Sequence, residues 1–283
     1  MAIGIGVNAW VWTSPFSSSA IPLINKAHAM GFDVLTIPVE DPALIDVAAI
    51  RSAQSNTSIR FQVTGAFGPT RDLTHDDHRY RDESLNYIQQ VVAICEKLGA
   101  TVMVGPMYSA VGKRRQISAS QKQREWERAV EGLSAAGKIA ADYGVTLAIE
   151  PLNRFETDLI NTAAQVKQLI RDIDLPSVRI HLDTFHMHIE EKNMYDAIVL
   201  AGDDLVYVDA SESDRGTPGM GQVHWQEVRR ALRDIGYQGD VVIESFTPEC
   251  KTIADAAAIW RPLAPSQDEL AVDGCKFLRK LFQ

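Results

Sequence analysis

The sequence predicts a single (β/α)8 barrel, and three observations support this fold class. Short apolar, β-branched segments alternate with longer amphipathic segments along the 283 residues, and eight such alternations indicate a closed parallel barrel. The length suits a barrel, which takes about 250 residues. The alternative is an open doubly wound sheet, but GIGVNA holds only two glycines, inside the first strand, and no GxGxxG or GxxxxGK[ST] motif follows.

The elements follow one another in the order that a barrel requires. Strands are expected at residues 4–10, 34–39, 59–67, 101–107, 146–153, 178–186, 205–211 and 240–245. Helices are expected at 21–30, from 42, at 75–98, 118–143 and 162–173, and at the end of the chain up to 282. Because GTPGMG at 216–221 is a short loop and no linker is evident, we expect one catalytic domain over residues 1–283.

Composition excludes several classes of partner. The net charge of −9 argues against a nucleic acid, whose phosphates need clustered Lys and Arg. Cys95, Cys250 and Cys275 are scattered and lack CxxC spacing, which excludes a disulfide scaffold and fits a reducing cytosol. No signal peptide and no apolar run of about 18 residues is evident, so we expect a cytoplasmic protein without a membrane span.

Four carboxylates follow the apolar runs of the last four expected strands. Barrel active sites lie where strands end, and residues two apart on a strand share a face. The strand ends AIE, HLD, YVD and VIE place the carboxylates of Glu150, Asp183, Asp209 and Glu244 at similar heights in the barrel mouth. Taken singly, such a residue is more commonly a helix N-cap or an ion-pair partner.

Four converging carboxylates need a cation, because burial and mutual repulsion would otherwise return their protons. An oxygen-only ligand set favours Mg²⁺ or Mn²⁺ over zinc. The sequence therefore predicts one divalent metal site.

Further polar residues follow these strand ends and are typical of a rim that binds several hydroxyl groups, although each alone could be a solvated loop residue. They are Asn153, Arg154, Glu156, His186, Glu212 and Arg215. Trp10, Trp12 and Phe67 end early strands and indicate either an apolar wall of the site or core packing.

Several motifs resemble the ketose 3-epimerases, a family of xylose-isomerase-like barrels that includes D-tagatose, D-psicose (allulose) and L-ribulose 3-epimerases. They are IEPLNRFET, HLDTFHMHIEE, ESDRGTPGMG with HW three residues on, VVIES and AIWRPL. The resemblance covers most of the second half of the chain, and DTFHMxIEE is its most specific part.

The resemblance implies the same barrel, one metal ion, a sugar as substrate and a homo-oligomer, either a dimer or a tetramer. The metal is usually Mn²⁺, with Co²⁺ or Mg²⁺ often accepted. The family's two catalytic glutamates, which also ligate the metal, match Glu150 and Glu244, and its aspartate ligand matches Asp183. Its substrate-binding residues match Glu156, His186 and Arg215.

Two positions depart from the family pattern. The family's fourth ligand is a histidine, and Asp209 stands there, which would leave four carboxylates around a 2+ ion with a charge near −2. Thr36 replaces a glutamate at the end of the second strand, so the substrate could differ. We interpret His181, two residues before Asp183, as a buried core histidine; a contribution near the metal is the alternative.

The function implied is inversion of a free ketose at C3. One glutamate would remove the C3 proton to give a cis-enediolate, and the other would return a proton to the opposite face, with the metal polarising the carbonyl. The alternatives are an aldose–ketose isomerase, and an epimerase or dehydratase of keto-sugars or inososes. An abasic-DNA endonuclease conflicts with the acidic charge, and a non-catalytic sugar-binding barrel conflicts with paired Glu150 and Glu244.

Overall fold

Eight parallel strands close into a barrel in the computed structural model, which describes residues 3–282. β1 pairs with β2 on one side and with β8 on the other, so no strand edge is left open. The strands are β1 (Gly4–Asn8), β2 (Val34–Val39), β3 (Arg60–Gly65), β4 (Val102–Gly105), β5 (Thr146–Ile149), β6 (Val178–Asp183), β7 (Leu205–Asp209) and β8 (Asp240–Ile243). The predicted fold class is confirmed.

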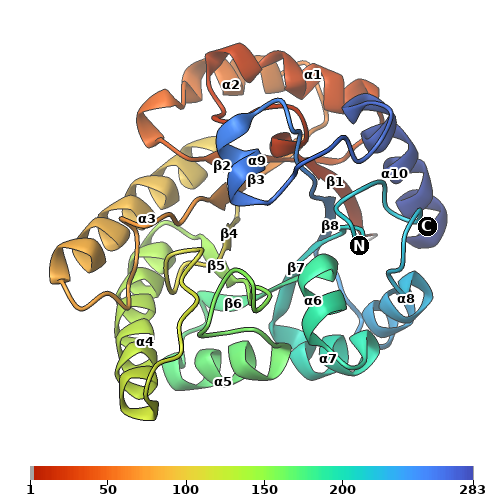
Figure 1. Ribbon diagram of the computed structural model, residues 1–283. Coiled ribbons are helices and arrows are strands. Elements are labelled where there is room, and N and C mark those ends of the chain that lie inside the picture. The colour runs from red at the N-terminus through yellow and green to blue at the C-terminus, as the bar shows by residue number, and fades with distance from the viewer. Residues whose placement is uncertain (1–2, 283) are drawn as a thin grey trace.

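Helices surround the strands as an outer ring, which Figure 1 shows along the barrel axis. The α-helices are α1 (Pro22–Ala29), α2 (Val47–Gln54), α3 (His78–Leu98), α4 (Ala119–Asp142), α5 (Ala163–Ile173), α6 (Thr184–Glu190), α7 (Met194–Ala201), α8 (Trp225–Asp234), α9 (Lys251–Ala256) and α10 (Gln267–Phe282). Short 3-10 helices are η1 (Ala9–Val11), η2 (Ser18–Ala20), η3 (Pro42–Leu44) and η4 (Gly202–Asp204). None of the helices in residues 3–282 has the length and apolar character that crossing a membrane demands.

Polar caps explain why the long helices begin and end where they do. The Ser118 hydroxyl accepts from the backbone N–H of Gln121 at the start of α4, and Thr162 forms a capping box with Gln165 at the start of α5. α3 ends at Gly99, whose φ of +72° is a left-handed conformation that glycine adopts without strain. These local signals fix the connections that carry the chain from strand to strand.

The barrel interior has a different core from the space between strands and helices. Inside, Val104, Ala148, Tyr207 and Val242 pack together, and the Thr36 and Tyr207 hydroxyls are hydrogen-bonded at 2.6 Å. The sequence comparison placed Thr36 at the end of β2, but in the structure it is the third of the six residues of this strand. The small inner cluster fills the barrel below its mouth, and a larger apolar core packs the strands against the helices.

Several predicted strands extend too far. The strand expected at 178–186 ends at Asp183, because the Asp183 Oδ1 accepts from the backbone N–H of Phe185 at 2.8 Å and starts α6. His186 consequently lies on a helix. Likewise, the strand expected at 4–10 ends at Asn8, whose side chain accepts from the Trp10 N–H and caps η1. Polar strand ends thus begin helical turns at the barrel mouth.

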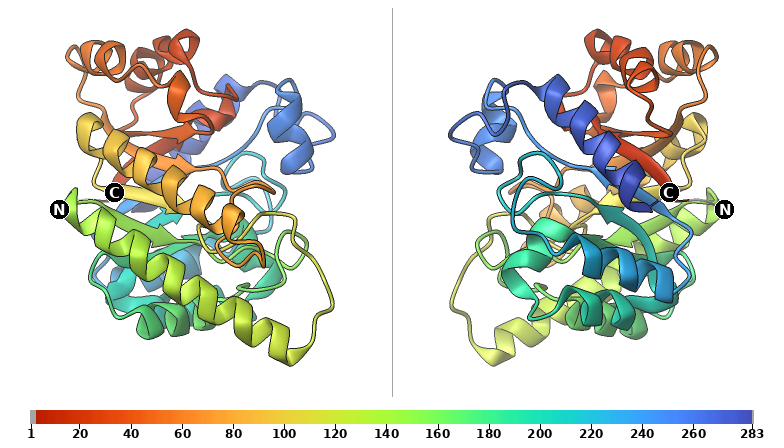
Figure 2. Two further views of the ribbon diagram at one scale, coloured as in Figure 1. Left: turned by 90° about the vertical axis from the view of Figure 1, so that its left-hand side faces the viewer. Right: turned by 90° about the vertical axis from the view of Figure 1, so that its right-hand side faces the viewer.

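Figure 2 shows the barrel from the side, with α9 at one end and the last turn of α10 at the other. In Figure 1 the α9 segment crosses in front of β2 and β3. It packs there through Ala254 and Ile259 in a small apolar cluster with Trp10 and Phe246. The carboxyl ends of the strands, where the predicted site residues lie, therefore have a helical segment on the β1–β3 side.

Candidate active site

All four predicted carboxylates are buried at the carboxyl ends of β5 to β8. Asp183 and Asp209 are register partners on neighbouring strands. Glu150 and Glu244 directly follow β5 and β8, and they are 7% and 6% exposed. A shift in the pairing of β6 with β7 between Ile180 and His181 sets this register.

Arg215 inserts a guanidinium among the carboxylates. Its Nη1 donates to Asp183 Oδ2 at 2.6 Å, to Glu244 Oε2 at 2.9 Å and to the Ser211 hydroxyl at 2.9 Å. The guanidinium also lies 4.0 Å from the centre of the Phe185 ring. The backbone of Arg215 has a φ of +65°, a strained conformation for a residue with a side chain, so the surrounding contacts hold it in place.

His186 is held by the loop after β5. The backbone N–H of Asn153 donates to His186 Nδ1 at 3.1 Å, so the proton of the neutral ring lies on Nε2. That nitrogen is 3.5 Å from Glu150 Oε1 and 3.7 Å from Asp183 Oδ2. The Asn153 amide also donates to Glu156 Oε1 at 2.8 Å. The structure thus links Glu156, Asn153 and His186 in one chain beside the carboxylates.

His181 lies one layer below Asp183 and is only 1% exposed. Its Nε2 is 2.9 Å from Asp209 Oδ2 and its Nδ1 is 3.7 Å from Glu150 Oε2. Neither ring nitrogen has a hydrogen bond, and Asp209 Oδ1 also lacks one. His181 is therefore buried, as the sequence predicted, but it belongs to the carboxylate cluster rather than to the apolar core.

The electrostatics of the cluster are unbalanced. Burial, and then the carboxylates of Glu244, Asp183 and Asp209, raise the pKa of Glu150 well above its usual range. Burial and neighbouring carboxylates likewise raise the pKa of Asp209 and of Glu244. Burial lowers the pKa of both His181 and His186 to about 3, so both rings are neutral.

Burial acts to lower the pKa of Arg215, but Asp183 and Glu244 outweigh it and raise that pKa. With the guanidinium charged and both histidines neutral, four ionised carboxylates would carry a formal charge of −3.

A divalent cation fits this arrangement. Within residues 3–282, two groups offer one ligand atom per residue, all within 4.8 Å of one another. One is Glu150, His181 and Asp209, and the other is Glu150, Asp183 and His186. Glu244 is in neither group, and one of its oxygens accepts from Arg215. Buried atoms of His181 and Asp209 have no hydrogen-bond partner, and a bound cation would supply one.

Two residues of the predicted rim lie away from the carboxylates. Glu212 accepts from three backbone N–H groups and from Trp225 Nε1, and so it fixes the loop after β7. Arg154 is exposed and pairs with Glu190. Both therefore shape the loops and are not gathered at the cluster.

The aromatic residues at early strand ends are mainly packing residues. Trp10 is buried against Phe246, with ring centroids 5.7 Å apart, and Phe67 packs edge-on against Tyr87 at 5.4 Å. Trp12 is partly buried, and its Nε1 donates to Asp268 on α10. Of the two interpretations, core packing describes Phe67 and Trp12, whereas Trp10 belongs to the cluster beneath α9.

The segment 107–116, which follows β4, is fixed by ion pairs. Lys113 Nζ lies 2.8 Å from Asp72 Oδ2, and Arg115 pairs with both Glu125 and Asp158. This part of the barrel mouth is therefore anchored to α4 and to the loops after β3 and β5.

Sequence reasoning missed the residues that hold Arg215. Ser211, Phe185 and Phe246 all contact its guanidinium, and Asn8 Nδ2 donates to Glu244 Oε1 at 3.4 Å. Only Asn8 gave a signal, as the polar residue that ends β1. The others depend on loop conformations that periodicity does not reveal.

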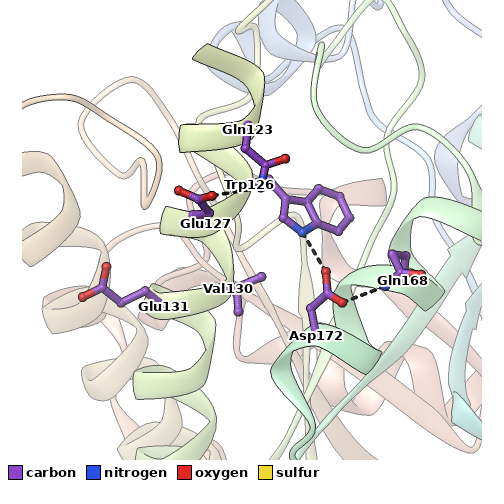
Figure 3. A pocket seen from close by; sticks show the side chains of 7 residues that line it. All are labelled: Gln123, Trp126, Glu127, Val130, Glu131, Gln168 and Asp172. Atoms are coloured by element: carbon purple, nitrogen blue, oxygen red, sulfur yellow. Dashed lines mark hydrogen bonds between the residues drawn. The ribbon is translucent and has the colours of Figure 1, made fainter. Parts of the chain in front are cut away.

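A surface groove between α4 and α5, shown in Figure 3, offers no competing active site. Several of its polar groups are paired with one another: Trp126 Nε1 donates to Asp172 Oδ2 at 2.8 Å, and Gln168 donates to Asp172 Oδ1 at 2.7 Å. The groove is on the outer wall of the barrel, away from the strand ends where chemistry occurs in this architecture.

Comparison with known proteins identifies relatives over nearly the whole chain. Residues 24–281 match the model of the xylose isomerase-like TIM barrel family. The chain is 33% identical to a probable ketose 3-epimerase of Synechocystis sp., over 99% of this chain and 97% of that protein. It is 32% identical to the D-psicose 3-epimerase of Agrobacterium fabrum, over 95% and 93% of the two chains.

Solved structures extend this similarity to the backbone. The D-allulose 3-epimerase from Methylomonas sp., in complex with D-allulose, superposes with a TM-score of 0.94 at 28% identity. The similarity covers 99% of this chain and 98% of that one.

Proposed function

Because the chain belongs to the ketose 3-epimerases of the xylose isomerase-like TIM barrel family, as its motifs predicted, we propose that it is a divalent-metal-dependent epimerase that inverts free ketoses at C3. The observation that carries this proposal is the buried pair Glu150 and Glu244. The two carboxyl groups lie at the ends of different strands, in one cluster, and both have raised pKa values. Such a pair can hold a proton on one side of a substrate and accept one on the other.

The metal would be held by side chains at the ends of β5 to β8. The ligands that we propose are Glu150, Asp183, Asp209 and Glu244, with Mn²⁺ as the expected ion and Mg²⁺ or Co²⁺ as alternatives. When bound, a divalent cation would polarise the ketose carbonyl and so acidify the neighbouring C–H. Its positive charge would also offset the excess of carboxylates that Arg215 alone leaves unbalanced.

Glu150 and Glu244 would move the proton. One of them, ionised, removes the proton from C3, which leaves a cis-enediolate of the sugar. The other, protonated, gives its proton to the opposite face of C3, so the configuration inverts. One glutamate gains the proton that the other loses. Burial favours the protonated form of both carboxyl groups, so either glutamate could serve as the proton donor.

Three further residues would hold the sugar. His186 directs an N–H toward the carboxylates, and Glu156 lies beside it through Asn153, so both are positioned to bind hydroxyl groups. Arg215 would stabilise negative charge that develops on the substrate. In the structure it also orients Glu244, because its Nη1 donates to Glu244 Oε2.

We propose one catalytic domain over residues 1–283 and a homo-oligomer in solution, which light scattering would measure. A cytoplasmic location fits the three cysteines, all of which are free.

The proposed function is tested by incubating the Mn²⁺-loaded protein in D2O with a panel of free ketoses and following the sugars by NMR. Deuterium at C3 together with the inverted product is the expected result. Exchange at C1 or C2 with an aldose product would instead make the enzyme an aldose–ketose isomerase. If no sugar exchanges despite bound metal, the proposal of ketose chemistry is wrong.

A further inference from the structure

We propose that His181 is a further direct ligand of the divalent cation, added to the four proposed carboxylates on the side of Glu150 and Asp209. It would supply from β6 the nitrogen donor that the ketose 3-epimerase pattern places on β7. The inference rests on the proposed metal dependence, but not on the identity of the sugar. One ligand atom from each of the three residues lies within 4.8 Å of the others, and all three residues are buried.

The first support is a set of unpaired polar atoms. Both ring nitrogens of His181 and the Oδ1 of Asp209 are buried without a hydrogen bond. Buried polar atoms in folded proteins nearly always have a partner, and three unpaired ones in two adjacent side chains indicate a missing ligand. The 2.9 Å separation of His181 Nε2 from Asp209 Oδ2 lacks the alignment of a hydrogen bond, so this pair does not satisfy itself.

The second support is the packing that holds the imidazole in place. The His181 ring packs edge-on against Tyr207, with centroids 5.0 Å apart and planes at 90°. The Tyr207 hydroxyl is hydrogen-bonded to Thr36, so the layer below is already paired. The ring is left with Nε2 beside Asp209 and Nδ1 on the side of Glu150.

In the other candidate group, the histidine already has a protein partner, which favours His181 over His186 as the nitrogen ligand. His186 Nδ1 accepts from the Asn153 N–H. Asp183 uses Oδ1 to cap α6 and Oδ2 to accept from Arg215. The Arg215 guanidinium is hydrogen-bonded to Asp183 and Glu244, and within residues 3–282 no Lys or Arg forms an ion pair with Asp209. The side with His181 and Asp209 is where a metal ion gains most.

The ligand chemistry makes a prediction about the metal. A neutral imidazole adds a nitrogen ligand without adding to the negative charge of the four carboxylates. Imidazole suits Mn²⁺, Co²⁺ and Zn²⁺ better than Mg²⁺, which prefers oxygen. We therefore expect Mn²⁺ and Co²⁺ to bind more tightly than Mg²⁺, and this preference to depend on His181.

Pulsed EPR of the Mn²⁺-loaded protein without sugar tests the inference, because it resolves coupling to a directly bound imidazole nitrogen. Wild type and His186→Asn should both show this coupling. His181→Leu should lose it and should bind Mn²⁺ at least about tenfold more weakly. His186→Asn is the matched control, because it alters the other buried histidine beside Glu150.

A second variant covers the case in which His181→Leu folds poorly. The double variant His181→Leu with Asp209→His moves the imidazole from β6 to β7 and should regain the nitrogen coupling. If wild type binds Mn²⁺ without nitrogen coupling, or if the coupling is lost in His186→Asn and kept in His181→Leu, the inference is wrong. An active epimerase without nitrogen coupling would overturn it and leave the proposed function intact. If the metal has a nitrogen ligand but no sugar reacts, the inference about His181 stands and the proposed function is wrong.

Discussion

Two buried carboxylates, Asp240 at the start of β8 and Glu244 directly after it, lie at opposite ends of the barrel interior and have different surroundings. Asp240 accepts from both terminal nitrogens of Arg60, at 2.7 and 3.3 Å, and from Gln62 Nε2 at 3.0 Å. Glu244 shares one guanidinium nitrogen with Asp183, and burial and Asp209 raise its pKa.

The difference shows that burial alone does not identify a functional carboxylate. Both residues are 6% exposed, but Asp240 pairs with a guanidinium of its own, whereas Glu244 shares one with Asp183. At the carboxyl end, four carboxylates face one guanidinium, and buried atoms remain without partners. An excess of buried negative charge lowers the stability of a protein, and it is typical of sites that bind a ligand or catalyse a reaction.

Removing the charge of Glu244 tests most directly whether the carboxyl end of the barrel is the catalytic end. We expect Glu244→Gln to lower turnover of a ketose by about 10²–10⁴-fold, the usual contribution of a proton-transferring group, with the fold unchanged. NMR-detected exchange in D2O measures the turnover, and circular dichroism checks the fold. Near-normal turnover in this variant would exclude Glu244 as a catalytic residue.

Replacing Arg215 at the carboxyl end or Arg60 at the amino end shows how much each arginine contributes to the free energy of unfolding. Arg215→Met leaves buried carboxylates without their cation, so the metal-free protein should lose about 3–5 kcal/mol in urea unfolding. The control Arg60→Met should lose only about 1 kcal/mol or less, because the Arg60 side chain is 55% exposed. Equal losses in the two variants would contradict the proposed difference between the ends.

Metal addition should distinguish the two ends as well. Mn²⁺ at one hundred times its dissociation constant should raise the free energy of unfolding of the EDTA-treated wild type by about 2.7 kcal/mol, since binding favours the folded state. At the same Mn²⁺ concentration, Asp240→Asn should keep this gain and Glu150→Gln should lose most of it. An unchanged gain in Glu150→Gln would remove Glu150 from the ligands.

The smallest effect is expected at the amino end. Asp240→Asn weakens the hydrogen bonds from Arg60 and Gln62, so urea unfolding should show a loss of about 1 kcal/mol. Turnover and Mn²⁺ binding should stay at wild-type values. A tenfold loss of turnover would mean that the amino end contributes to catalysis after all.

The sequence alone determined the barrel and which strand ends bear carboxylates. Alternation of short apolar and long amphipathic segments reflects the repeating unit of the fold, so it predicted eight strands and their order. The same periodicity placed Glu150, Asp183, Asp209 and Glu244 just after or at the ends of β5 to β8. These are local properties of each strand and need no knowledge of its neighbours.

Which of these groups have partners depends on how the strands and loops are arranged in three dimensions. The shift between Ile180 and His181 brings His181 beside Asp209, and the conformation of the loop after β7 carries the Arg215 guanidinium to Asp183 and Glu244. The same loop uses Glu212 as an internal anchor, although its sequence position suggested the rim. Register and loop path join residues from different strands, and a pattern along one strand does not contain that information.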